Sequence, residues 1–260
     1  MTTFTYNGTD LSTLGNITLI NDYLDLPARR GGNKMIPFRH GTVFNQKYYE
    51  ERTIAVGIAV LASTLASLES QLNTIRGLFA EQTQKTLAIT YEDASVKTAL
   101  VTVDKALQVN RVNTMARIVV EFTMCEPFFR LSTLIADNTT TINASPKAMT
   151  VTNTGTMEER DPTIVIDGPF SSITIANTTN GASVTYTGAI GAAETVTIGT
   201  LNGEYYATLS TGSANVIGNV THSGSSALLP INAGANTLSI TSAGGNNTGT
   251  VKISFYPPFL

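Results

Sequence analysis

The sequence predicts a mainly β protein, in which an N-terminal β domain with one α-helix is followed by a C-terminal β-sandwich. Residues 115–126 alternate between apolar and other side chains with a period of two, which indicates a long strand. Residues 63–82 carry apolar side chains at helical spacing. Thirteen of the 16 Lys and Arg residues lie at or before Arg130, and the chain beyond is rich in Thr, Ser, Asn and Gly. This change of composition indicates two domains.

The first domain is expected to span residues 1–135. Asn7-Gly8 is a turn signal between two opening strands, and Ser63 or Thr64 can cap the helix, whose apolar stripe should pack on a sheet. Pro127 cannot donate to a β-ladder, so the long strand should end at Glu126. Residues 104–113 appear irregular. The expected strands lie around Phe4 and Tyr6 and at 14–20, 43–49, 51–61, 86–91, 96–103 and 115–126.

A connector is expected over residues 136–162, with a short strand at 148–152 and a charged run, Glu158 to Pro162. The sandwich should then span residues 163–260. Its short strands are separated by turns such as Asn180-Gly181, at intervals typical of this architecture. They are expected at 163–166, 172–176, 183–186, 195–198, 205–209, 216–220, 237–241 and 250–256.

A basic, glycine-containing loop runs from Ala28 to Gly41 and is followed directly by a strand signal. Two interpretations remain open, a solvated surface loop and an element that contacts another subunit. The candidate contact residues are the four cations of the loop, Arg29, Arg30, Lys34 and Arg39.

The residues that catalysis or metal binding would require are scarce. The chain has two histidines, His40 and His222, and one cysteine, Cys125, none at a zinc-ligand spacing. Cys125 follows Met124 in the predicted strand and is expected to be a small packing residue. The sequence therefore predicts no enzyme activity, no cofactor and no metal site.

Several segments together resemble the distal tail proteins of long-tailed, siphovirus-type bacteriophages. The exit of the long strand, Cys125 to Phe129, is similar to the end of the first domain in that family. Pro37, Arg39 and Gly41 match a Pro-x-Arg-x-Gly element near the turn of a projecting hairpin, although Phe38 stands where a small residue is expected. Gly199-Thr200 replaces an acidic residue common in related sequences. The segments of the second domain that carry the resemblance are Val151 to Gly155, Asp161 to Gly168, Leu229 to Leu238 and Tyr256 to Leu260.

The resemblance covers essentially the whole chain and implies a structural role in the virion. The first domain would form a belt or ring, a homohexamer, and the second domain would be galectin-like. The implied partners are other copies of the chain, the tail tube protein and an adsorption protein of the tail fibre or hub, with the tape-measure protein as a further candidate. The implied location is the phage tail tip, after assembly in the host cytoplasm.

A carbohydrate-binding module that contacts the host surface through its second domain is the alternative function. Sugar-binding sandwiches place an aromatic ring under the sugar, and Tyr186, Tyr205 and Tyr206 are the candidates. A net charge of -3 without a basic cluster in the second half argues against nucleic acid. The N-terminus shows no signal-peptide pattern, and the longest apolar segment, 54–62, is shorter than the roughly 20 residues of a membrane span.

Overall fold

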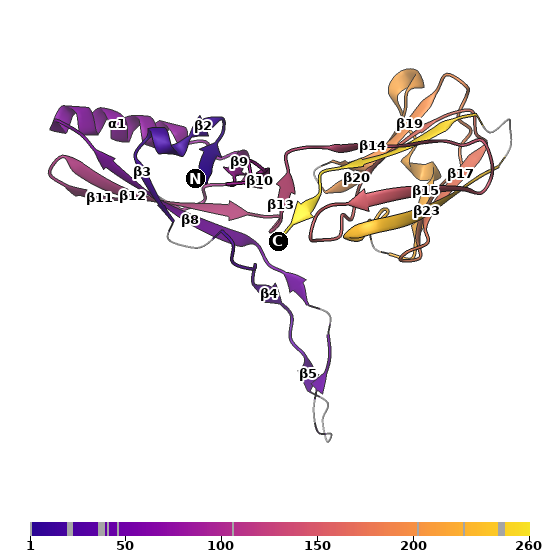
Figure 1. Ribbon diagram of the computed structural model, residues 1–260, viewed down its shortest axis with the longest axis horizontal. Helices are drawn as coiled ribbons and strands as arrows, with labels where there is room; N and C mark the ends of the chain where they lie inside the picture. Colours follow the sequence, from indigo (N-terminus) through magenta and orange to yellow (C-terminus); the bar gives the residue numbers. More distant parts are fainter. Residues whose placement is uncertain are drawn as a thin grey trace. The chain divides into compact units, whose positions relative to one another are not determined.

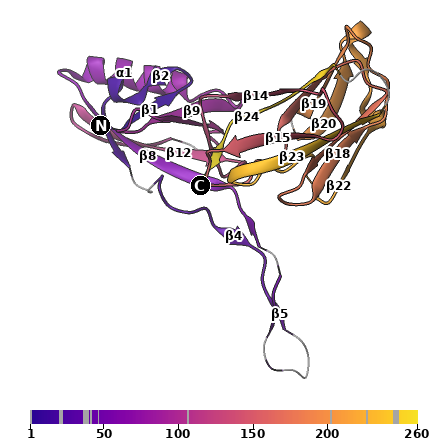
Figure 2. The ribbon, with the colours of Figure 1, turned by 45° about the vertical axis from the view of Figure 1, so that its right-hand side comes forward.

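The computed structural model divides the chain into two compact units, Met1–Arg130 together with Leu260, and Leu131–Phe259. Figures 1 and 2 show the order of the elements along each unit. The structure describes residues 2–19, 23–35, 40, 42–45, 47–105, 107–201, 203–225, 227–243 and 248–260.

The first unit is built on a four-stranded antiparallel sheet in the order β11-β12-β8-β3. The central strands β8 (Arg52–Leu61) and β12 (Met115–Met124) pair along their full length, from Arg52 opposite Met124 to Leu61 opposite Met115. The edge strands are β11 (Gln108–Val112) and β3 (Asn16–Leu19). The alternation in the sequence is confirmed, because Ile118, Val120 and Phe122 all point into the core.

A second sheet of this unit follows the order β2-β1-β9-β10-β13. The expected turn joins β1 to β2, with positive φ at both Asn7 and Gly8. The hairpin of β9 and β10 turns at Asp93, whose carboxylate accepts a hydrogen bond from the Ser95 backbone nitrogen at 2.9 Å. The bounds are β1 Thr3–Tyr6, β2 Thr9–Asp10, β9 Lys85–Thr90, β10 Val96–Val101 and β13 Phe129–Leu131, and a 3-10 turn, η1, spans Leu11–Thr13.

The helix α1 spans Leu65–Leu78 and buries Leu68, Leu72 and Ile75. Thr64 is its N-cap, since its hydroxyl accepts a hydrogen bond from Ser67 N at 3.1 Å. The expected end near Gln82 is wrong. The helix stops at the C-cap Phe79, whose ring packs into the core, with centroids 5.2 Å from Tyr6 and 6.0 Å from Phe122.

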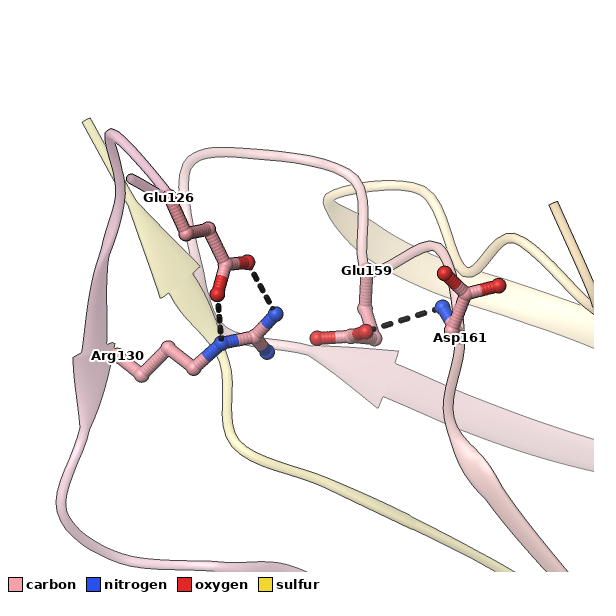
Figure 3. A network of polar contacts seen from close by, with 4 residues as sticks. All are labelled: Glu126, Arg130, Glu159 and Asp161. Atoms are coloured by element: carbon pink, nitrogen blue, oxygen red, sulfur yellow. Dashed lines mark hydrogen bonds and ion pairs between the residues drawn. The ribbon is translucent and has the colours of Figure 1, made fainter. Parts of the chain in front are cut away.

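Three further expectations for the first unit are corrected by the structure. Residues 108–112, expected to be irregular, form β11, which is exposed at every position and therefore lacks an alternating apolar pattern. The strand expected at 43–49 is two short pieces, β6 (Thr42–Val43) and β7 (Tyr48–Tyr49). β12 ends at Met124, two residues before Glu126. Glu126 instead pairs with Arg130 at 2.5 Å (Figure 3).

The second unit is a β-sandwich of two antiparallel sheets, β14-β24-β16-β19-β20-β21 and β15-β23-β17-β18-β22. Both sheets contribute to one apolar core, which includes Ile164 and Ile198 from the first and Ile175 and Ile240 from the second. The bounds are β14 Ile135–Thr141, β15 Lys147–Asn153, β16 Thr163–Asp167, β17 Ser172–Asn177, β18 Ala182–Tyr186, β19 Thr195–Leu201, β20 Glu204–Leu209, β21 Ala214–Asn215, β22 Val220–Ser223, β23 Gly234–Ala243, β24 Thr250–Phe255 and β25 Pro258–Phe259, with 3-10 turns η2 Thr211–Ser213 and η3 Ile217–Asn219.

The connector expected over residues 136–162 is corrected, because these residues contribute β14 and β15 to the sandwich. Both are edge strands, and β14 is rich in Asn and Thr, so its sequence carries little apolar signal. The strand expected at 216–220 is also wrong, since residues 217–219 form η3 and the strand β22 begins at Val220.

Buried asparagines bind the loops at one end of the sandwich. Asn153 donates to the carbonyls of Met157 at 2.8 Å and Ile231 at 3.1 Å, and accepts from Gly155 N at 2.9 Å. Asn177 donates to the Pro230 carbonyl at 2.8 Å. Because these amides are buried and fully used, they fix the loops to the core.

Candidate functional site

A two-stranded arm, defined here as residues 29–49, leaves the body of the first unit (Figures 1 and 2). Its base is a ladder between β4 (Arg29–Arg30) and β7, with Arg30 opposite Tyr48. Further out, β5 (Lys34–Met35) pairs with β6. The sequence folds this way because glycine and asparagine residues separate the short pieces of strand. Pro37, Phe38, Arg39 and Gly41, which carry part of the family resemblance, lie outside the described residues.

Aromatic contacts hold the base of the arm. The Arg29 guanidinium lies over the Tyr49 ring, with Cζ 5.0 Å from the ring centroid, and donates a 3.0 Å hydrogen bond to Tyr49 Oη. The Tyr49 ring meets Phe128 edge to face at 5.7 Å. Glu50 N also donates to the Ala28 carbonyl at 2.8 Å. The arm is therefore anchored where it joins the core.

A further contact joins the two sides of the arm between its ladders. Asn45 Nδ2 donates to the Gly32 carbonyl at 3.1 Å, and Asn45 N lies 3.5 Å from Asn33 Oδ1. These polar bonds cross-link a segment in which the ladders are only two residues long.

The charge of the arm differs from that of the rest of the chain. It contains five cations, at positions 29, 30, 34, 39 and 47, and no Asp or Glu. Since the whole chain has a net charge of -3, the arm carries +5 and the remainder carries -8. The arm is complementary in sign to the chain that bears it.

The four predicted contact residues differ in whether the chain itself already engages them. Arg29 is used within the chain, by Tyr49. The side chains of Arg30 and Lys34 are exposed, and neither makes a hydrogen bond or ion pair with another side chain of the described residues. Arg39 lies outside the described residues. Of the four predicted contact residues, Arg30 and Lys34 are therefore the described cations available to a partner.

Sequence reasoning missed the apolar side chains of the arm. Met35 is 83% exposed, Phe44 is 74% exposed and Tyr48 is 50% exposed. Three large apolar groups on one thin hairpin are unusual for a solvated loop. The signal that could have found them is the presence of apolar residues among the glycines and cations between residues 28 and 50.

The four-stranded sheet of the first unit presents a second surface. Leu61, Met115 and Val112 lie opposite one another on neighbouring strands, and all three are exposed. Residues opposite each other in an antiparallel sheet share a face, so they form an apolar row at the end of β8, β12 and β11. Beside it, β11 is an exposed edge strand. Such an edge can pair with another chain.

The remaining candidate residues do not form a chemical site in the described chain. His40, Cys125 and His222 are exposed, and Cys125 is not the packing residue that was expected, because β12 ends before it. Within the described ranges, no three or more His, Cys, Asp and Glu residues are grouped to hold a metal ion. The described helix lacks the length and apolar character needed to cross a lipid bilayer.

Comparisons with known proteins agree with this architecture. Residues 10–124 match the family described as the phage tail protein RIFT-related domain. The crystal structure of the Dit protein of phage SPP1, described as a paradigm of hub adsorption apparatus in phages that infect Gram-positive bacteria, superposes with a TM-score of 0.70 at 14% identity and covers 100% of both chains. A chain of the phage p2 baseplate in its activated, strontium-bound conformation gives 0.48 at 10% identity over 98% of both chains. No curated protein sequence matches.

The match to SPP1 Dit confirms that the fold resembles that of a distal tail protein, as predicted, and the structure confirms the mainly β fold class with one helix in the described residues. The galectin-like assignment of the second unit stays a prediction.

Proposed function

We propose that this Dit-like phage tail protein is a structural hub whose copies assemble head to tail into a ring through the first unit. The ring would join the tail tube to the adsorption apparatus of the tail tip. The role is structural and requires no catalytic group. Its support is the phage tail domain at residues 10–124, the SPP1 Dit-like fold of the whole chain and the surfaces of the first unit.

The arm is the observation that carries this proposal. Met35, Phe44 and Tyr48 expose apolar surface that the chain itself does not cover, and Arg30 and Lys34 expose charge. Burial of apolar surface releases about 25 cal/mol per Å², so a partner that covers the arm would stabilise it. An anchored hairpin with an apolar and basic surface fits a neighbouring protein better than it fits solvent.

A second copy of the chain is a suitable neighbour. The contact of an arm with a different surface of the next copy is heterologous, and such contacts close into a ring when the rotation between copies allows it. The chain outside the arm carries a net charge of -8 against +5 on the arm, so the arm of one copy and the remainder of the next copy have net charges of opposite sign. The open edge β11 and the row of Leu61, Met115 and Val112 supply further surface on the first unit. The family resemblance suggests six copies.

The remaining partners follow from the resemblance. The tail tube protein would contact one face of the ring and the adsorption protein, from the fibre or hub, the other, with the tape-measure protein as a further candidate. The protein would reside in the virion, at the tail tip, after assembly in the host cytoplasm.

The mass of the purified protein in solution tests the proposal. If the protein forms a ring, its mass is a single multiple of the monomer mass, and this assembly requires the arm. A protein that stays monomeric at all concentrations would contradict the proposal.

A further inference from the structure

One end of the sandwich core in the second unit is polar where the pattern of the strands calls for apolar side chains. Thr200 shares a strand face with the buried Val196 and Ile198, since alternate residues of a strand point the same way. Tyr205 lies opposite Thr200 on β20, and His222 lies opposite the buried Val184 on β22. On the core-facing side of the strands, this end of the sandwich therefore carries a hydroxyl, a phenol and an imidazole, and both Tyr205 and His222 are exposed there.

These side chains come from different sheets and meet at the end of the sandwich. The rings of Tyr205 and His222 have centroids 5.8 Å apart and an interplanar angle of 65°, an edge-to-face contact. Tyr205 Oη donates a 3.1 Å hydrogen bond to Asp161 Oδ1. The same oxygen accepts the Leu228 backbone N–H at 2.9 Å. We refer to Thr200, Tyr205, His222 and Asp161 as the polar mouth.

The loop that carries Asp161 is held in place. The Asp161 backbone nitrogen donates to Glu159 Oε1 at 3.1 Å, as Figure 3 shows, and Glu159 N donates to the Ile231 carbonyl at 2.9 Å. With its own backbone fixed and one oxygen used by two donors, the Asp161 carboxylate has a defined orientation. It retains acceptor capacity at its second oxygen.

The polar mouth contains a partly exposed aromatic ring and a hydroxyl without a hydrogen-bond partner. Tyr205 is 37% exposed although its hydroxyl is bound, so part of the ring faces solvent in a fixed position. Thr200 Oγ1 is buried and finds no hydrogen-bond partner among the described residues. A buried hydroxyl without a partner is unfavourable, because it loses its hydrogen bonds to water and gains none in return. This arrangement is costly for a purely structural core.

The other tyrosines considered as sugar platforms are engaged elsewhere. Tyr186 is buried in the core, so it cannot meet a ligand at the surface. Tyr206 lies over Gly199, where a Cβ would be 3.0 Å from Tyr206 Oη, so the glycine makes room for that ring. Tyr205 alone of the three presents a partly exposed ring at the mouth.

We infer that the polar mouth is a saccharide-binding site, in which a sugar ring packs on Tyr205 and its hydroxyls hydrogen-bond to Asp161 and His222. A sugar has an apolar C–H face and peripheral hydroxyls that both donate and accept, which matches one exposed aromatic face with acceptors and donors at its edge. The acidic Asp161 disfavours a phosphate ligand.

The test uses the full-length protein on an array of immobilised glucose, galactose, N-acetylglucosamine and rhamnose oligosaccharides, followed by titration of any sugar that binds. Tyr205→Ala removes the platform and should weaken binding by about tenfold or more. Tyr205→Phe keeps the ring and loses the bond to Asp161, so a smaller loss is expected. Tyr256→Ala, at another partly exposed tyrosine of the same unit, is the control and should leave binding unchanged.

Two further readouts keep the result interpretable. If Tyr205→Ala fails to fold, Asp161→Asn replaces it, since it removes the charge and retains an acceptor oxygen. The His222 imidazole resonances should shift on saturation with the bound sugar, which locates binding at the mouth. The oligomeric mass should be unchanged in every variant, which separates this inference from the proposal of a ring. Binding to none of the immobilised sugars, or undiminished binding by Tyr205→Ala, would overturn the inference.

Discussion

The Arg29 guanidinium stacks on the ring of Tyr49, with Cζ 5.0 Å from the ring centroid, and joins the two strands at the base of the arm. The same ring packs against Phe128, which follows the long strand β12. The orientation of the arm thus depends on a contact between β4, β7 and the end of the central sheet.

Replacement of Tyr49 by Ala should loosen this base. It removes a cation-π contact and an aromatic pair, together about 1–2 kcal/mol, so the Glu50 amide, which donates to Ala28, should exchange its hydrogen about 5–30 times faster. Hydrogen-deuterium exchange of the dilute protein measures this. Tyr48→Ala, at the exposed neighbour, is the control and should leave the Glu50 rate unchanged. Equal rates in both variants would show that the stack does not hold the arm.

Reversal of an arm charge should weaken assembly. Arg30→Glu places a carboxylate where the arm is expected to meet an acidic surface, and an exposed pair contributes about 0–1 kcal/mol. The association constant from sedimentation should fall, and the difference from the wild type should shrink as salt is added, since charges are screened over about 10 Å at 0.1 M. Arg76→Glu makes the same charge change on the exposed face of α1. If Arg30→Glu and Arg76→Glu lower the association constant equally, the arm has no specific role in assembly.

Asn153→Ala should destabilise the second unit. Asn153 is 1% exposed, and its loss leaves the Met157 carbonyl and the Gly155 N–H without this partner. It also removes one of the two donors to the Ile231 carbonyl, which keeps its bond from Glu159 N. Each unsatisfied buried group costs about 1–3 kcal/mol. Urea unfolding followed by circular dichroism gives the free energy. Asn143→Ala, at an exposed asparagine that bonds Lys147 at 3.0 Å, should change it by less than about 0.5 kcal/mol. A small effect at both sites would mean that the buried amides are not needed.

Alkaline pH should destabilise the first unit through Tyr91. Burial, followed by the neighbouring Tyr23, raises the pKa of Tyr91 from 10.0 to about 12. The folded state therefore keeps this proton at pH values where the unfolded state loses it. The stability it contributes is complete below pH 10 and is lost as the pH rises through about 12. Urea unfolding between pH 9 and about 12 measures it. The free energy of unfolding of Tyr91→Phe should fall less over this pH range than that of the wild type. If the two free energies fall in parallel with pH, Tyr91 is not the group responsible.

The sequence predicts the parts of the fold that bury apolar surface in a regular period. β8, β12 and the buried face of α1 follow this rule, and Thr64 marks the start of the helix as its N-cap. The edge strands β11 and β14 do not, because an edge buries little and its residues need not alternate. At the candidate site, the cations are visible in the sequence. The use of Arg29 by Tyr49 and the exposure of Phe44 depend on which strands pair, which composition does not encode.

The mass of the protein in solution, with and without its arm, tests the ring directly. In the comparison variant, residues 31–47 are replaced by Asn-Gly, a two-residue turn that closes the ladder between Arg30 and Tyr48, which lie opposite each other. Light scattering after size exclusion should give one closed multiple of the 27.6 kDa chain for the wild type, about 166 kDa for a hexamer, and the monomer mass for the variant. The circular dichroism of the two should match. A wild type that stays monomeric at high concentration, or a variant that keeps the mass of the ring, would contradict the account.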